Sequence, residues 1–393
     1  MMKPKIRFNG FTDDWEQRKL GDVAQITMGQ SPAGSTYSDV PSDYILVQGN
    51  ADLENGWVKP RVWTTQITKQ AYIGDLIMSV RAPAGAMGKT SYNAVIGRGV
   101  AAIKGNEFIY QLLVKMDKEG YWKKDSTGST FESLNSESIK NAEIKLPSNE
   151  EQTVIGTYFE QLDHLITLHQ RKCDGLKKLK KYMLQNMFPQ NGEKTPKIRF
   201  QGFINAWEQR KLSELVQIER GGSPRPIEAY ITDAPNGLNW VKIGDAPVQG
   251  HYITKTAEKI KPEGLSKTRQ VQPGDLILSN SMSFGKPYIM GIDGCIHDGW
   301  LLIRDNKKAF DLTFLYHLLG TPQMLSQYKS LAAGSTVNNL NKELVGGTIV
   351  TIPNLDEQQV LGQYLESLDN LITLHQRKKK YTKKPIILLK ITF

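Results

Sequence analysis

The sequence predicts an α+β protein made of two tandem copies of one mixed module. Each copy is followed by a long helix, and the halves are related by an approximate two-fold repeat. Three observations lead to this prediction. A chain of 393 residues is long for a single core and suits two domains. Several motifs occur twice in the same order. A seven-residue repeat of apolar residues closes each copy, as is typical of helices that pair along a seam.

The composition limits the classes of protein that fit. Only two cysteines occur, Cys173 and Cys295, so a disulfide scaffold is excluded and a reducing compartment is expected. The start of the chain lacks the apolar stretch of a secretion signal. No window approaches the roughly 18–20 apolar residues that cross a bilayer, so we expect a soluble cytoplasmic protein. The formal net charge of +10 favours a polyanionic partner, although basic proteins without one are common.

The duplication is visible in four matched segments. Residues 4–26 and 196–218 are identical at 15 of 23 positions, and residues 147–172 and 353–378 at 17 of 26. The first match continues with the Gly-x-Ser-Pro anchor, Gly29-x-Ser31-Pro32 against Gly221-x-Ser223-Pro224. Farther along, Gly74-Asp75-Leu76-Ile77 returns as Gly274-Asp275-Leu276-Ile277, and Gly128-Ser129-Thr130 as Gly334-Ser335-Thr336. The segments between these anchors barely resemble each other. The sequence leaves open whether those segments have drifted in unimportant loops or contact two different targets.

Each module mixes short β-prone runs with few helices, which favours an α+β domain over a doubly wound sheet. The predicted strands are 44–47, 75–80 and 100–103 in the first copy, and 240–243, 275–279 and 300–303 in the second. The predicted module helices are 108–116 and 312–319.

A helix start follows each module. Ser148 and Asn354 are expected to accept from free backbone N–H groups. Glu151 and Glu357, three residues later, are expected to reach back as in a capping box. The first helix is predicted over about residues 150–188 and would be about 55 Å long at 1.5 Å per residue.

The heptad rows of the two helices are predicted to form one antiparallel seam that holds the modules at a fixed separation. In the alternative, each helix packs on its own module. The two histidines of the rows are interpreted as packed seam residues, because no second ligand stands at metal spacing beside them. The predicted seam residues are Ile155, Leu162, Leu165, His169 and Leu176 in the first helix, and Leu361, Leu368, Leu371 and His375 in the second.

The end of the chain departs from the repeat. After Lys378 the resemblance to the first copy stops, and Pro385 lies within the next turns. We therefore expect the second helix to be shorter than the first, with a β-prone segment over residues 386–393.

No catalytic constellation emerges from the sequence. The run before Gly88-Lys89-Thr90 lacks the spacing of a phosphate-binding loop. The six histidines are scattered, and neither a methyl-donor turn nor a cluster of carboxylates typical of a metal-dependent nuclease is present. We expect no catalytic residue and no metal site.

Four motifs recur in the same order in both halves. They are Arg-Phe-x-Gly-Phe…Trp-Glu-Gln-Arg-Lys-Leu at the start of each half, Gly-Asp-Leu-Ile, Gly-Ser-Thr, and the closing Leu-Asp-x-Leu-Ile-Thr-Leu-His-Gln-Arg-Lys. In this order they resemble the specificity subunit of type I restriction–modification systems. The resemblance covers the chain up to Lys378. It implies two target recognition domains, each reading half of a bipartite double-stranded DNA sequence, and helices that set the spacing.

The resemblance also implies the partners. Two modification subunits that bind S-adenosylmethionine would dock on the chain, and restriction subunits would bring ATP and Mg²⁺. This chain would hold no cofactor. The implied domains are 1–147 and 189–353 for target recognition, 148–188 for a central spacer helix, and 354–393 for a C-terminal spacer helix. The alternatives are a stand-alone DNA-binding regulator and, less favoured, a self-sufficient DNA methyltransferase or nuclease.

Base-edge contacts are expected from the divergent loops, and phosphate contacts from lysine, arginine and hydroxyl groups. The predicted DNA-binding residues of the first module are Gln48, Asn50, Arg81, Lys89, Arg98, Ser129 and Thr130. Those of the second are Lys242, Arg269, Asn280, Lys286, Ser335 and Thr336.

Overall fold

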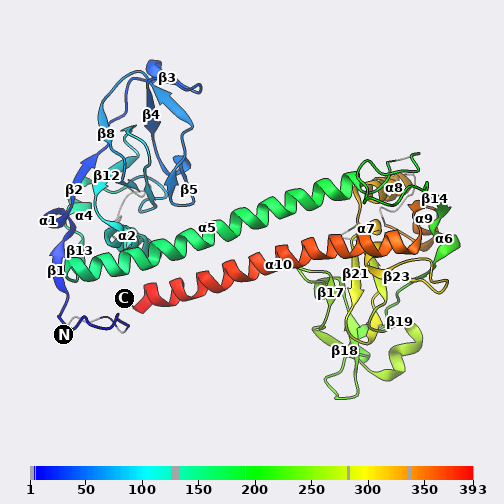
Figure 1. The fold of residues 1–393 in the computed structure, drawn as a ribbon. Coiled ribbons are helices and arrows are strands. Elements are labelled where there is room, and N and C mark those ends of the chain that lie inside the picture. Colours follow the sequence, from blue (N-terminus) through cyan, green and yellow to red (C-terminus); the bar gives the residue numbers. More distant parts are fainter. Residues whose placement is uncertain are drawn as a thin grey trace. The chain divides into compact units, whose positions relative to one another are not determined.

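The computed structural model describes residues 4, 6–124, 133–190, 192–280, 284–333 and 339–392, with the backbone alone for residues 124, 333 and 383–392. The chain divides into two compact units: residues 1–170 with 378–393 (unit 1), and residues 171–377 (unit 2). Each unit combines sheets with helices, so the predicted α+β class is confirmed (Figure 1). No helix in the described part of the chain is long and apolar enough to cross a bilayer.

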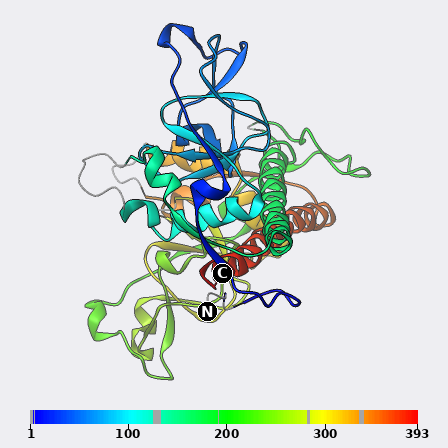
Figure 2. The ribbon, with the colours of Figure 1, turned by 90° about the vertical axis from the view of Figure 1, so that its left-hand side faces the viewer.

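The described residues of unit 1 form three sheets, and Figure 2 looks onto the blue-to-cyan strands of this unit. The two larger sheets have the orders β2-β12-β9-β10-β6-β5 and β3-β7-β4-β11-β8. The strands are β1 (Glu16–Lys19), β2 (Gln25–Met28), β3 (Tyr37–Ser38), β4 (Tyr44–Val47), β5 (Leu53–Glu54), β6 (Trp57–Val58), β7 (Val62–Thr64), β8 (Lys69–Ala71), β9 (Leu76–Ser79), β10 (Met87–Lys89), β11 (Ala94–Ile96), β12 (Val100–Lys104) and β13 (Glu143–Leu146). The helices are α1 (Leu20–Val23), α2 (Glu107–Lys118), α3 (Tyr121–Lys124), α4 (Ser136–Lys140) and α5 (Asn149–Asn186), which continues into unit 2.

Unit 2 has the same plan. Its larger sheets have the orders β15-β23-β20-β21-β17 and β18-β16-β22-β19. The strands are β14 (Glu208–Lys211), β15 (Gln217–Arg220), β16 (Leu238–Val241), β17 (Tyr252–Ile253), β18 (Glu258–Ile260), β19 (Arg269–Val271), β20 (Leu276–Ser279), β21 (Pro287–Met290), β22 (Gly294–Ile296), β23 (Trp300–Arg304) and β24 (Ile349–Ile352). The helices are α6 (Leu212–Leu215), α7 (Leu312–Leu319), α8 (Pro322–Ala333), α9 (Lys342–Gly346) and α10 (Leu355–Thr392), whose end belongs to unit 1.

The sequence repeat is a repeat of topology. Five strands of the larger sheet and four of the smaller sheet correspond in order between the units. In each smaller sheet one pair is parallel: β4 with β11, and β16 with β22. The predicted strands and both module helices are present with small shifts of their ends, and α7 has the predicted bounds. The divergent segments therefore lie on one common backbone plan.

Steric or backbone constraints require glycine at several matched positions of the repeat. A Cβ atom on Gly29 or Gly221 would lie 2.1 Å from a backbone carbonyl oxygen, so no side chain fits at either position. Gly74 and Gly274 have φ values of +91° and +92°, which favour glycine. Backbone packing thus explains why the shared motifs keep glycine.

The start of each long helix differs in part from the prediction. Ser148 and Asn354 cap the helices as expected, since their side chains accept from the N–H groups of Glu151 at 3.3 Å and Glu357 at 3.0 Å. The predicted return bond of the two glutamates is wrong. Each carboxylate instead accepts two bonds from the arginine of the opening Arg-Phe motif. A bidentate charged pair is stronger than one bond to a backbone N–H, so it takes precedence.

The prediction of a short second helix is wrong. α5 and α10 each have 38 residues and are therefore about 57 Å long at 1.5 Å per residue. α10 continues past Pro385 to Thr392, so the described residues 386–392 are helical and do not form the predicted β-prone segment. A proline lacks the N–H group that would bond to the carbonyl four residues earlier, and its ring clashes with that same carbonyl. The other backbone hydrogen bonds are unaffected, so the helix-forming lysine and leucine residues on both sides maintain the helix.

Pairing of the two long helices occurs within each unit. In unit 2, Leu176 of α5 packs against the apolar cluster that contains Leu361 and Leu368 of α10. In unit 1, the side chain of Lys379 donates to Gln170. The N-terminal part of each long helix packs on its own module, as the alternative predicted. In α5, Ile155 belongs to the unit 1 core and Leu162 packs against it. In α10, Leu361 and Leu368 belong to the unit 2 core.

The placing of Leu165 and Leu371 on the seam is wrong. Their side chains are 41% and 43% exposed, whereas Ile155 is 2% exposed. A straight helix drifts by about 20° per heptad relative to a 3.5-residue repeat, so one row of apolar residues turns toward solvent. His169 and His375 are half-buried, as expected for residues near a seam.

Candidate nucleic-acid interface

In unit 1, four of the predicted DNA contacts, Gln48, Asn50, Arg81 and Arg98, line one hollow. Its volume is about 360 Å³. Gln48 follows β4 and Arg98 follows β11, and because these strands are parallel their carboxyl ends meet at one edge of the sheet. Asn50 and Arg81 lie in the next turns of chain beside them. The hollow is lined by Ser31, Tyr37, Gln48, Gly49, Asn50, Arg81, Ala82, Arg98 and Gly99.

Hydrogen bonds fix the loops around this hollow and leave its cations exposed. The buried carboxylate of Asp52 accepts from the N–H groups of Gln48 at 2.7 Å and Gly49 at 3.2 Å. Oγ of Ser31 accepts from the N–H of Arg98 at 3.1 Å. Among the described residues neither Arg81 nor Arg98 has an acidic partner, and both are exposed. Free guanidinium and amide groups on a fixed loop are the groups that read base edges or bind phosphate.

Unit 2 has a hollow at the corresponding edge, with different chemistry. Its volume is about 740 Å³, and it is lined by Ser223, Pro224, Arg225, Pro226, Ile227, Glu228, Trp240, Lys242, Glu258, His297 and Asp298. Lys242 follows β16 and Asp298 follows β22, again a parallel pair. Where unit 1 has Arg98, unit 2 has Asp298, 200 residues later. The frame is therefore shared, whereas the charges that it displays differ.

Several of these residues were missed from the sequence. Arg225, Glu258 and His297 line the unit 2 hollow, and Ser31 and Tyr37 line the other. The available signal was the matched Gly-x-Ser-Pro anchor, which places Ser31 and Ser223 at the two edges.

Other predicted contacts lie outside the hollows. Lys89 pairs with Glu107 at 2.7 Å, and its Nζ lies 4.8 Å from the ring centroid of Trp57. Arg269 pairs with Glu219 at 3.3 Å.

Two more residues of the second module have local roles. Asn280 is 2% exposed and donates to the carbonyl of Asp298 at 2.8 Å, so it supports the hollow from below its surface. Lys286 is exposed beside the Tyr288 ring, at 4.8 Å from its centroid. Ser129, Thr130, Ser335 and Thr336 lie outside the described residues.

Comparison with known proteins decides the family. The family model of the type I restriction modification DNA specificity domain matches residues 12–178 and again residues 205–383, once for each copy. The chain belongs to this family. The type I restriction enzyme MjaVIII specificity subunit of Methanocaldococcus jannaschii is 23% identical over 390 residues, 95% of this chain and 90% of that protein. The putative MjaX specificity subunit of the same organism is 30% identical over 190 residues, 46% of this chain and 44% of that protein.

Solved structures support the fold of this specificity family. The type I restriction–modification S subunit of M. genitalium matches with a TM-score of 0.67 at 14% identity, over 99% of this chain and 98% of that one. A second structure is described as the basis of complex assembly and conformational transition of the type I system. It matches with a TM-score of 0.53 at 18% identity, over 97% and 96% of the two chains. The two-module plan with long helices is thus shared with specificity subunits.

The long helices of this specificity-family member carry matched exposed apolar residues. Val154, Leu165 and Leu168 lie on one face of α5, because 11 and 14 residues correspond to about three and four helical turns. Each has an apolar counterpart on α10, 206 residues later. The exposed pairs are Val154 with Val360, Leu165 with Leu371, and Leu168 with Leu374. We call these two sets the apolar faces.

Proposed function

We propose that this chain is the DNA-recognition subunit of a type I restriction–modification complex. Each domain reads one half of a bipartite double-stranded target, and the long helices set the spacing of the halves. The recognition domains are residues 1–147 and 189–353, and the spacer helices are residues 148–188 and 354–393. A cytoplasmic location belongs to the same proposal.

One observation carries this function. The two units repeat the same strands, yet their hollows at the same sheet edge display different side chains. A shared frame with exchanged surface groups suits two readers of two different sequences. Arginine recognises guanine through O6 and N7, and glutamine or asparagine recognises adenine through N6 and N7, so the unit 1 hollow has the groups for base readout. Affinity would come from phosphate contacts and fall steeply with salt.

The partners follow from family membership and from the apolar faces. Two matched faces suit two copies of one partner, and we assign them to modification subunits that bind S-adenosylmethionine and methylate adenine. Restriction subunits would complete the nuclease and bring ATP and Mg²⁺. In this proposal the chain itself is non-catalytic and serves as reader and scaffold.

Domain exchange tests the proposal. Residues 33–146 are replaced by the corresponding segment of a relative, the complex is reconstituted with its modification subunits, and methylated adenines are mapped across a genome. We expect one half of the recognised sequence to change and the other half to remain. The matched control replaces the divergent segment of unit 2 and should change only the other half. A change in both halves, or methyl transfer by the isolated chain, contradicts the proposal.

A further inference from the structure

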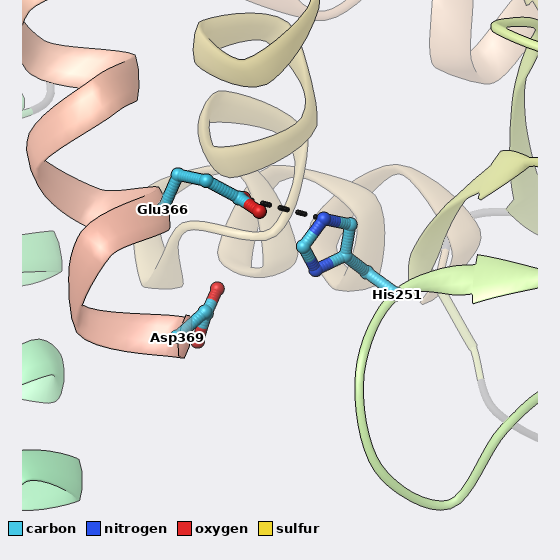
Figure 3. Close-up of side chains that lie close together, drawn as sticks. All are labelled: His251, Glu366 and Asp369. Carbon is cyan, nitrogen blue, oxygen red and sulfur yellow. Dashed lines mark ion pairs between the residues drawn. The ribbon is translucent and has the colours of Figure 1, made fainter. Parts of the chain in front are cut away.

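Unit 2 contains a cluster of metal-ligand side chains that does not line the hollow. Nε2 of His251 lies 3.2 Å from Oε2 of Glu366, and one ligand atom from each of His251, Glu366 and Asp369 lies within 4.8 Å of the others. His251 precedes β17, and the two acids lie one turn apart on α10. Figure 3 shows the imidazole and the carboxylates turned toward one another. A recognition-domain loop and a spacer helix thus contribute to one site.

A second histidine is directed at the same acids. Nε2 of His317, on α7, lies 4.0 Å from Oδ2 of Asp369, and its side chain is only 1% exposed. In the described part of the chain, Nε2 of His317 lacks a hydrogen-bond partner, and the contact between His251 and Glu366 is an ion pair that does not have the geometry of a hydrogen bond. Buried polar atoms are nearly always hydrogen-bonded, so a buried imidazole nitrogen left without a partner beside this cluster indicates that a ligand is to be expected.

Unit 1 provides an internal comparison for the acids. Glu160 and Asp163 of α5 correspond to Glu366 and Asp369 at a separation of 206 residues. In unit 1, Nζ of Lys89 lies 3.6 Å from Oε1 of Glu160. The two acids are therefore repeated on both long helices, and in unit 1 the glutamate is paired with a lysine ammonium group.

The groups opposite the aspartate also differ between the units. Nε2 of Gln111 donates to Oδ2 of Asp163 at 2.8 Å. His317 stands 206 residues after Gln111 and takes its place opposite Asp369. Unit 2 thus has imidazoles where unit 1 has an ammonium and an amide. The unit 2 set, His251, Glu366 and Asp369 with His317 beside Asp369, has the nitrogen and oxygen donors of a transition-metal site, whereas the unit 1 set does not.

Lys180 of α5 contacts this cluster as a competing cation. Its Nζ donates to Oδ1 of Asp369 at 2.6 Å. A metal ion at the cluster would replace this ammonium. Lys180 also lines a cavity of about 430 Å³ together with Lys177, Lys181 and Gln376, which gives its side chain space to turn aside.

We infer that His251, His317, Glu366 and Asp369 bind one divalent transition-metal ion of the Zn²⁺ class, with Lys180 turning aside as the ion enters. Zn²⁺ binds histidine nitrogen and carboxylate oxygen at about 2.0–2.2 Å in tetrahedral geometry. Such ligand atoms lie about 3.3–3.6 Å apart. Here His251 and Glu366 are separated by 3.2 Å, His317 and Asp369 by 4.0 Å, and the atoms of the three-residue cluster by up to 4.8 Å, so the side chains would close in slightly on the ion. Mg²⁺ and Ca²⁺ prefer oxygen ligands and fit this set less well. The two carboxylates balance the charge of the ion. Its role is to fasten the second recognition domain to α10, independently of which DNA is read.

Metal titration of the full chain is the primary test. The purified chain is treated with a chelator, dialysed, and titrated with Zn²⁺ by calorimetry, and Co²⁺ absorption reports the coordination geometry. We expect one equivalent to bind, tetrahedral Co²⁺ bands, and a rise in Tm that grows with metal concentration. Absence of stoichiometric binding to the wild-type chain overturns the inference.

Two variants assign the binding to this cluster. His317→Gln installs the amide that unit 1 already uses at this place, so the fold should persist. It should weaken binding at least about tenfold, since loss of a mere outer-shell partner already costs 10–100-fold. Lys180→Met removes the competing ammonium and should tighten binding. Unchanged affinity in both variants means that Zn²⁺ binds elsewhere and overturns the inference.

A matched control uses unit 1. Gln111→Ala removes the corresponding amide and should leave stoichiometry and affinity unchanged. A loss of binding in this variant contradicts the assignment. If Lys180→Met instead lowers Tm in the presence of Zn²⁺, the cluster is a salt-bridged contact and not a metal site. DNA binding in gel-shift assays separates this inference from the proposed function, because the unit 1 hollow shares no residue with the cluster.

Discussion

Nε and Nη2 of Arg7 each donate to a carboxylate oxygen of Glu151 at 2.7 Å, and Arg199 repeats both bonds with Glu357 in the second unit. The glutamates are almost fully buried. Hydrogen bonding to Glu357 raises the pKa of Arg199, so the guanidinium stays charged at any ordinary pH. The next residue of each motif also contacts the closing helix, as the Phe8 and Tyr158 rings lie 5.5 Å apart. The opening motif is therefore shared because it attaches the start of each copy to its long helix.

Breaking this pair should destabilise unit 1. Arg7→Met leaves Glu151 as a buried carboxylate without its partner, which is the costly way to disrupt an ion pair. We expect a lower Tm for this single variant and partial recovery in the double variant Arg7→Met, Glu151→Leu. Scanning calorimetry measures both. Arg18→Gln, which loses only an exposed pair with Glu16, is the control and should leave Tm unchanged.

Substitutions in the hollows should act on one half-site each. Arg98→Gln keeps the backbone bond to Ser31 but removes a free guanidinium, so binding of the first half-site should weaken about 10–100-fold. Lys242→Gln should affect only the second half-site. Competition binding with DNA altered in either half measures this. Equal loss against both halves in either variant would show that the residue contacts phosphates without reading sequence.

The apolar faces should govern assembly and not folding. Leu168→Ser and Leu374→Ser change side chains that are 36% and 43% exposed, so each should lower the free energy of unfolding by only about 1 kcal/mol. Each should reduce the occupancy of one modification subunit, and the double variant should remove both. Mass photometry of the reconstituted complex counts the subunits. Full occupancy in the double variant would exclude these faces as the docking surface.

Alanine substitutions at two glycines distinguish a glycine required by backbone packing from one that only lowers helix propensity. Gly29→Ala places a Cβ atom 2.1 Å from the carbonyl oxygen of Gly97 and should prevent normal folding of unit 1. Gly175→Ala, in the interior of α5, meets nothing within 4 Å and should stabilise the chain by about 0.5–1 kcal/mol. Thermal denaturation of both variants checks the contrast. A destabilising Gly175→Ala would mean that a partner protein or an unrecognised contact needs space there.

The sequence predicted those features that depend on local chemistry. The caps at Ser148 and Asn354 and the helices that they start follow from side chains within a few residues. Gln48 and Arg98 were proposed because they lie in the divergent loops; Gln48 directly follows the predicted strand 44–47, whereas β11, the strand before Arg98, was not predicted. The return bond of Glu151 was mispredicted because its real partner, Arg7, is 144 residues away.

Features that depend on distant segments were not predictable. His251, His317 and Glu366 are separated by tens of residues, and no spacing rule brings them together. Lys89 reads as a free basic residue, but α2 supplies Glu107 as its partner. The continuation of α10 past Pro385 was missed because a proline was given more weight than the helix-forming residues around it.

The repeated acids of the spacer helices have a consequence for how new specificities arise. Glu160 with Asp163, and Glu366 with Asp369, are alike, whereas the groups opposite them are not. A foreign recognition domain therefore needs only a pair of basic, amide or imidazole groups at this position to pack on either long helix. Recognition domains can thus be exchanged during evolution while the helices stay unchanged.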